Sequence, residues 1–176
     1  MKLLCVFILS LSCIYMVSTF GWYGYKPEAS NLQAVYPIYK KGMRTFKLLK
    51  SEAEFNELLA TGKYFSLIDK MMIAKEQDDS SCKHLKPIYE LYHDKYDKYM
   101  YMLKDNDVQL YMAYGWKDKG IVGYGVFNKE YCEADVNVKH YYHEAHFNDS
   151  SFVIVYDFFV SFENYLDWGV LFSCWQ

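Results

Sequence analysis

The chain alternates short apolar segments with short polar breaks, and this spacing constrains its fold more than any other feature. From Tyr64 onward, about eight segments rich in β-branched and aromatic residues are predicted as strands. The breaks between them hold Asp, Asn, Lys and Gly, which are typical of turns. This spacing predicts a mainly β protein built as an antiparallel meander. The predicted strands are 64–73, 83–93, 98–104, 108–116, 121–127, 134–146, 152–160 and 170–175.

A meander of this length leaves two exposed edges unless it closes on itself. Closure into a barrel removes both edges, and eight strands enclose room for one small ligand. We therefore expect an eight-stranded antiparallel barrel over residues 51–176, with a two-sheet β-sandwich as the alternative.

One short helix is predicted at the start of this domain. Ser51 is its expected N-cap, Glu54 occupies the third position of a capping box, and Gly62 ends it. The preceding stretch, 20–50, has no clear period and is predicted as an irregular leader.

The N-terminus has the form of a secretory signal peptide. Lys2 precedes an apolar run over 3–17, which is shorter than the roughly 20 residues of a spanning helix. We expect residues 1–19 to be removed and the protein to be extracellular; cleavage after Gly21 and an uncleaved membrane anchor are the alternatives.

Composition and motifs exclude several classes of function. Nineteen Lys and Arg against 22 Asp and Glu leave no basic block, so nucleic acid is not an expected partner. The sequence holds no nucleophile or phosphate-binding motif, which indicates a protein that is not an enzyme and needs no cofactor. The histidines of 140–146 lack the spacing of a zinc-binding helix, so no metal site is expected.

Three cysteines remain after the signal peptide: Cys82, Cys132 and Cys174. In an oxidising compartment, they allow one disulfide and one unpaired thiol. Barrel closure favours Cys82–Cys174, with Cys132–Cys174 and a reduced set as alternatives. The sequon at 148–150 makes Asn148 a candidate glycosylation site.

Aromatic residues crowd the middle strands, where their apolar rings and polar tips suit a small-molecule pocket. If 108–116 is a strand, its larger and more apolar face points inward. A carboxylate beside these rings would offset the charge of an ammonium ligand. The alternative is that the aromatics pack the sheet and Asp157 has a structural partner. The candidate ligand-binding residues are Tyr99, Tyr101, Leu110, Met112, Tyr114, Trp116, Tyr124, Glu133 and Asp157.

Several short motifs follow one another in a familiar order. They are a helix with Phe55, Leu58 and Leu59, the segment 61–68, the acidic break ending at Cys82, Tyr156-Asp157, and Cys174-Trp175. In this order, the chain resembles tick salivary lipocalins of the histamine-binding type, as a divergent or C-terminally shortened member. It departs from them in lacking Gly-x-Trp in the first strand and in stopping at Gln176.

The resemblance implies a secreted protein that sequesters a small host mediator in a barrel cavity. The implied ligand is a biogenic amine, such as histamine or serotonin, or a lipid mediator. The resemblance also implies that an early cysteine pairs with a late one. The alternative is a secreted protein-binding module whose barrel is filled and which binds a host protein through its surface.

Overall fold

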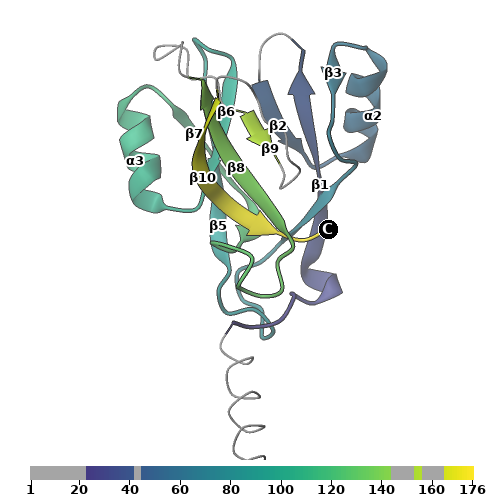
Figure 1. The fold of residues 1–176 in the computed structure, drawn as a ribbon, viewed down its shortest axis with the longest axis vertical. Coiled ribbons are helices and arrows are strands. Elements are labelled where there is room, and N and C mark those ends of the chain that lie inside the picture. The colour runs from purple at the N-terminus through teal and green to yellow at the C-terminus, as the bar shows by residue number, and fades with distance from the viewer. Residues whose placement is uncertain (1–22, 42–44, 144–152, 156–164) are drawn as a thin grey trace, which may run out of the picture.

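The computed structural model describes residues 23–41, 45–143, 153–155 and 165–176 (Figure 1). These residues form antiparallel sheets with few helices, so the mainly β prediction is confirmed. The strands are β1 (Leu32–Lys40), β2 (Thr45–Leu49), β3 (Tyr64–Phe65), β4 (Met71–Ala74), β5 (Lys86–His93), β6 (Lys98–Met102), β7 (Lys117–Gly125), β8 (Val136–His143), β9 (Val153–Val155) and β10 (Tyr165–Cys174). The helices are α2 (Glu52–Ala60) and α3 (Asp105–Ala113), with a 3-10 turn, η1 (Ala29–Asn31), before β1.

The same unit of structure occurs three times along the chain. In each unit, the first strand pairs with the second as a hairpin, and a later strand returns to pair with the first strand on its other side. The units are β1–β2–β4, β5–β6–β7 and β8–β9–β10. In the first two units, a helix connects the second strand to the third, and α2 and α3 lie on opposite flanks of the sheets (Figure 1).

The first two units correspond residue by residue. Tyr36 pairs with Leu49 in the first hairpin, and Tyr89 pairs with Met102 in the second. Both members of the second pair lie 53 residues further along, since 89 − 36 = 53 and 102 − 49 = 53. The two hairpins therefore share one register, and residues 53 positions apart are equivalent in the first two units.

The helices obey the same offset. Ser51 before α2 and Lys104 before α3 have φ of −112° and −106°, so both chains enter the helix from an extended residue. Gly62 and Gly115 follow the two helix ends with φ of +68° and +92°. Such left-handed residues favour glycine and end a helix. Ser51 accepts a hydrogen bond from the Glu54 backbone N–H, so the predicted helix and its cap are confirmed.

The first strands also supply one equivalent core residue each. Val35, Ile88 and Val138 are at most 1% exposed and belong to one hydrophobic cluster. Each pairs with a residue in the third strand of its own unit. These partners are Met71, Gly123 and Phe172.

The third strands β4, β7 and β10 contact one another in a ring. The core residues of the third strands are Met71, Gly123 and Phe172. In each contact, one strand contributes the residue three positions after its core residue, and the neighbouring strand contributes the residue one position after its own. This cyclic pattern gives the fold an internal pseudo-threefold symmetry. The pairs are Ala74 with Tyr124, Val126 with Ser173, and Trp175 with Met72.

The finer prediction of a meander barrel is not confirmed. The larger sheet has the order β2-β1-β4-β7-β5-β6, with β3 beside β1, so β7 lies between β4 and β5 instead of following β6. A three-stranded sheet, β10-β8-β9, completes the fold. Within the described ranges, no closed barrel of consecutive strands forms, because each third strand returns to the first strand of its own unit.

Two local predictions are wrong. The irregular leader expected over 20–50 contains β1 and β2, which form the first hairpin of the larger sheet. The strand expected over 108–116 is mostly α3. Its alternating apolar residues also fit a helical period, in which Val108 and Tyr111 share the inner face.

Candidate functional site on the outer face of helix α3

Helix α3 is held to the sheet by its inner face. Val108 is buried there in a hydrophobic cluster with Leu91, Met100, Met102 and Trp116, and Tyr111 packs against the same cluster. The backbone N–H of Trp116 donates to the carbonyl of Tyr111 at 3.2 Å, which ties the end of the helix to β7. These contacts fix which side of α3 faces away from the sheet.

The side that faces away carries apolar residues in its C-terminal half, next to the exposed Asn106 and Gln109. Leu110, Ala113 and Tyr114 are spaced i, i+3 and i+4, so they line one side of the helix. Leu110 is 54% exposed and Tyr114, the C-cap residue, is 71% exposed. Met112 is 42% exposed, but it is two residues from Leu110 and therefore lies on a different side of the helix. We call the surface formed by Leu110, Ala113 and Tyr114 the α3 face.

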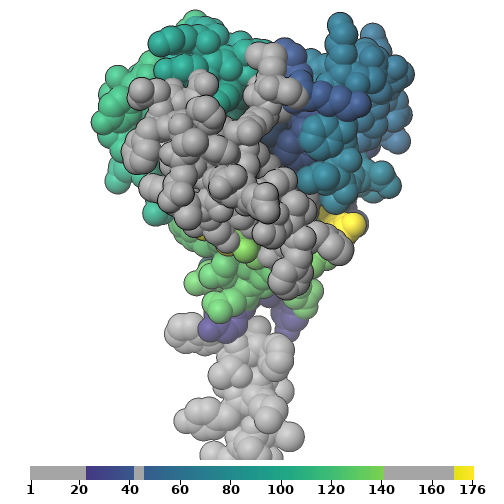
Figure 2. Space-filling model, turned by 45° about the horizontal axis from the view of Figure 1, so that its top comes forward, coloured from purple at the N-terminus to yellow at the C-terminus, as the bar shows by residue number. Residues whose placement is uncertain are grey.

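The equivalent positions of α2 have a different character. At the 53-residue offset, Leu110 corresponds to Glu57 and Tyr114 to Thr61, and both of these residues are exposed. The same position in the fold is therefore polar in one unit and apolar in the next. Exposed apolar side chains that gather on one element are typical of interaction sites. The residues around α3 (teal) and α2 (blue) lie on opposite sides of the molecule in Figure 2.

Charged residues flank the α3 face at both ends. Asp105 and Asp107 lie in the first turn, where they complement the positive end of the helix dipole. Lys117 and Lys119 are exposed on β7, just after the helix, and Lys117 forms an ion pair with Asp94. Lys104 also lies at the first end and Asp118 at the second, so the net charge is −1 before the helix and +1 after it.

A tyrosine fixes the N-terminal turn of each helix. A hydrogen bond to Asp105, with partial burial, raises the pKa of Tyr89 to about 12. In the first unit, Tyr36 donates to Glu52 at 3.2 Å; burial and Glu52 raise its pKa. These tyrosines are equivalent, and so are the two carboxylates. We take this pair as a repeated structural contact that anchors each helix to its sheet.

Aromatic rings support the C-terminal end of α3. His93 lies 4.4 Å from the ring of Tyr96 and 5.3 Å from that of Trp116, centroid to centroid. Tyr111 makes an edge contact with Trp116 at 5.9 Å. This ring cluster packs the last turn of α3 and Trp116 against His93 at the end of β5.

The structure brings only part of the predicted ligand set together. Leu110, Met112, Tyr114 and Trp116 lie on or next to α3, but they line no interior. The first three face outward, and the fourth is buried in the cluster beneath the helix. The prediction of an inward face is therefore wrong, because the segment is a helix whose inner side is set by Val108.

The remaining candidates are dispersed. Tyr99 is half-buried on β6 with the Lys47 ammonium 5.6 Å from its ring centre, and Tyr124 is half-buried on β7. Glu133 is exposed, and its carboxylate accepts a hydrogen bond from the Lys26 backbone N–H at 3.4 Å. Asp157 and Asn148 lie outside the described residues.

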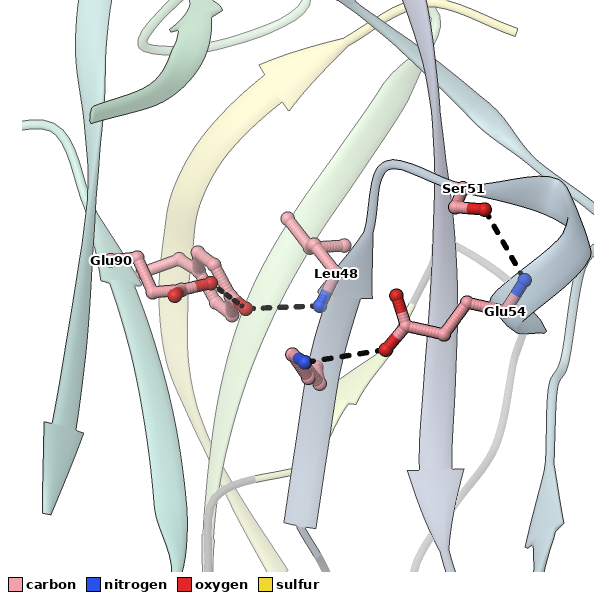
Figure 3. A network of polar contacts seen from close by, with 6 residues as sticks. Leu48, Ser51, Glu54 and Glu90 are labelled. Carbon is pink, nitrogen blue, oxygen red and sulfur yellow. Dashed lines mark hydrogen bonds and ion pairs between the residues drawn. The ribbon is translucent and has the colours of Figure 1, made fainter. Parts of the chain in front are cut away.

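Tyr101 has a structural role, because its hydroxyl joins Glu90 to Leu48, both of which are labelled in Figure 3. Its hydroxyl donates to the Glu90 carboxylate at 2.7 Å and accepts from the Leu48 backbone N–H at 2.9 Å. Burial and the nearby Glu90 raise its pKa well above the ordinary value. The side chain is fully buried and both polar partners are internal, so Tyr101 stabilises the core.

The disulfide joins Cys82 to Cys132, so the predicted Cys82–Cys174 pair is wrong, as is its Cys132–Cys174 alternative. The prediction relied on barrel closure, which the described residues do not form. Cys132 lies in the loop before β8, beside Cys82. Cys174 is a buried thiol in β10, with its Sγ 3.5 Å from the Met71 sulfur; burial raises its pKa.

Two open grooves, of about 340 and 540 Å³, lie near the disulfide and are lined by polar residues of 28–31 and 75–83. The carboxylate of Asp79 accepts hydrogen bonds there from Asn31, Ser81, Glu28 and Cys82. Burial tends to raise the pKa of Asp79, but these hydrogen bonds outweigh it and lower the pKa. Asp79 therefore joins the N-terminal segment to the disulfide loop.

In the part of the chain that the structure describes, no group of three or more metal-ligating side chains is clustered. No helix there is both long and apolar enough to span a membrane.

The fold and site define a disulfide-containing β protein of repeated units, with one helix that presents apolar side chains outward. Residues 12–126 and 66–152 match a family described as a domain of unknown function (DUF5648), and the chain belongs to that family. The two matches begin 54 residues apart (66 − 12), close to the 53-residue offset between the first two units. No curated protein and no solved structure matches the chain.

Proposed function

We propose that the protein is a secreted protein-binding module that binds its partner through the α3 face. One observation carries this proposal: Leu110 and Tyr114 are exposed on α3, at the positions where the equivalent helix α2 has Glu57 and Thr61. Polar residues can occupy these solvent-exposed helix positions without loss of stability, as they do in α2. Aromatic and large aliphatic side chains that a rigid scaffold turns outward are the residue types that supply binding energy at protein interfaces.

The interior supports a surface mode of binding. A small mediator needs a concave, mostly apolar pocket that encloses it. The ring of third strands is instead filled by large side chains, among them Trp175 and Phe172, which are fully buried. The two grooves near the disulfide are open and polar, and none of the predicted ligand residues lines them. The filled-module alternative therefore fits better than capture of a small mediator.

The disulfide supports an extracellular setting. Cys82–Cys132 needs an oxidising compartment to form and persist. The signal peptide over residues 1–19 lies outside the described residues and stays a prediction, as does the resemblance to tick salivary lipocalins.

Residues of the sister helix provide a matched test of the α3 face. The double variant Leu110→Glu/Tyr114→Thr gives α3 the outer residues of α2, which the fold already accommodates. We expect at least about a tenfold loss of partner binding, or about 1.4 kcal/mol, with an unchanged unfolding midpoint. Glu57→Gln on α2 is the control and should keep full binding. Equal binding by both variants would contradict the proposal.

Capture of a small mediator is tested separately. Histamine, serotonin and a leukotriene are titrated into the protein in a calorimeter. We expect no heat of binding from any of them. Saturable heat at one ligand per chain would favour the small-mediator prediction over the protein-binding module.

A further inference from the structure

We propose that the partner of the α3 face is a second copy of this chain, with two α3 helices packed antiparallel about a twofold axis. This inference rests on the proposed function and names its partner. In such a dimer, the same patch serves both copies, so the patch must be complementary to itself. The shape and the charge of the α3 face both meet this condition.

The shape argument concerns the apolar stripe. Leu110 and Tyr114 lie on either side of the stripe centre, and the small side chain of Ala113 lets a second helix approach closely. Antiparallel packing places Leu110 of each copy against Tyr114 of the other. A Leu–Tyr pair of this kind buries two large side chains that are otherwise more than half exposed.

The charge argument sets the direction of packing. Lys104, Asp105 and Asp107 give the start of α3 a net charge of −1, the last turn holds no basic residue, and Lys117, Asp118 and Lys119 give the segment after the helix a net charge of +1. An antiparallel pair places the acidic end of each copy beside the basic end of the other. A parallel pair would place like charges together, at a cost in free energy. Lys119 is the freer of the two lysines, since Lys117 also pairs with Asp94.

The size of the patch sets the expected affinity. α3 has nine residues, and one short helix buries less than the roughly 800 Å² per partner of a standard interface. We therefore expect a weak dimer whose population rises with protein concentration in the micromolar range and above.

Sedimentation of the purified protein over a concentration series tests this dimer. We expect Leu110→Glu/Tyr114→Thr to be monomeric and Glu57→Gln to match the wild type. Asp107→Lys and Lys119→Asp should each weaken the dimer about tenfold, and the two changes together should restore it. This rescue would not follow from a purely structural role. A wild-type protein that stays monomeric at several hundred micromolar would overturn the proposal.

Photo-crosslinking separates failure of this inference from failure of the proposed function. A benzophenone amino acid replaces Gln109, which is exposed beside the α3 face. The variant is irradiated alone and with the extracellular fluid of the secreting cells. An adduct of two copies in both samples supports the dimer. An adduct with a different protein alone overturns the dimer but keeps a protein-binding α3 face, and no adduct overturns both.

Discussion

The hydroxyl of Tyr101 accepts a hydrogen bond from the backbone N–H of Leu48, although the two residues belong to different repeat units. They occupy equivalent positions, since 101 − 48 = 53. The second strands of the two units, β2 and β6, are thus joined by a side chain where no backbone ladder pairs them. The internal symmetry is broken at this position, because the first unit has Leu48 where the second has Tyr101. This difference links the two edge strands β2 and β6.

Tyr101→Phe tests this link. Removing the hydroxyl leaves the buried Leu48 N–H without its acceptor and Glu90 without its donor. We expect the free energy of unfolding to fall by about 1–3 kcal/mol in urea titrations. Tyr92→Phe is the control, because its hydroxyl bonds to the partly exposed Asp97 at 3.1 Å. Its loss should stay below about 1 kcal/mol, and equal losses would show that the Tyr101 link adds nothing.

The two helix N-caps provide a prediction in the opposite direction. Lys104 has the backbone geometry of Ser51 but makes no side-chain cap hydrogen bond. Lys104→Ser should give α3 the cap that α2 already has and raise the free energy of unfolding by about 0.5–1 kcal/mol. Thermal and urea unfolding measure the change.

The reverse change belongs in the same experiment. Ser51→Ala removes an existing cap and should lower the free energy of unfolding by about 1 kcal/mol. If Lys104→Ser destabilises the protein, the two helix starts are not equivalent. The 53-residue offset would then not predict how a side chain from one unit behaves in the other.

The contrast between α2 and α3 shows what the sequence could reveal. Ser51, Glu54 and Gly62 are local signals that predict α2 without knowledge of the fold. Asp105 and Gly115 provide similar signals for α3, but a carboxylate also marks a turn, and the alternation over 108–116 fits a strand. The choice between them depends on Val108 packing against the sheet, which is a tertiary contact.

The repeat was hidden for a related reason. Equivalent positions differ in side chain, as Leu48 and Tyr101 or Glu57 and Leu110 do, so the identity between units is low. The shared register becomes visible only when the strands are paired. Disulfide pairing was also beyond sequence reasoning, because it depends on which loops meet. Leu110, Met112 and Tyr114 were predicted to face inward as ligand-binding residues of a strand, but they are exposed, because the segment is a helix.

The disulfide predicts a defined pattern of thiol reactivity. In the protein without residues 1–19, unfolding without a reductant should expose one thiol, that of Cys174, and reduction should expose three. Mass spectrometry after alkylation counts and locates them. Alkylation of Cys132 before reduction would contradict the Cys82–Cys132 bridge.

Loss of this bridge should be costly. Cys82 and Cys132 are 50 residues apart, so the bridge limits the unfolded chain considerably. For a loop of this length, we expect Cys132→Ser to lower the free energy of unfolding by about 4 kcal/mol. Cys174→Ala is the matched control, because it removes a buried thiol without opening a loop, and its cost should be clearly smaller.

His140 predicts how stability depends on pH. Burial on β8 lowers its pKa to about 4 from an ordinary 6.5, because the folded state disfavours the charged imidazole. Between these values, the unfolded chain binds the proton and the folded protein does not. The contribution of His140 to stability is therefore complete above pH 6.5 and is lost as the pH falls toward 4, by up to about 3 kcal/mol.

Urea unfolding at pH 7 and at pH 4.5 measures this loss. In His140→Gln, the difference in unfolding free energy between the two pH values should shrink by most of that amount, since no imidazole remains to titrate. Asp79 does not account for this loss. Its pKa lies below the ordinary 3.8, so its contribution to the free energy of unfolding is lost only at lower pH than these two values. If His140→Gln keeps the wild-type difference between the two pH values, the burial argument for His140 fails.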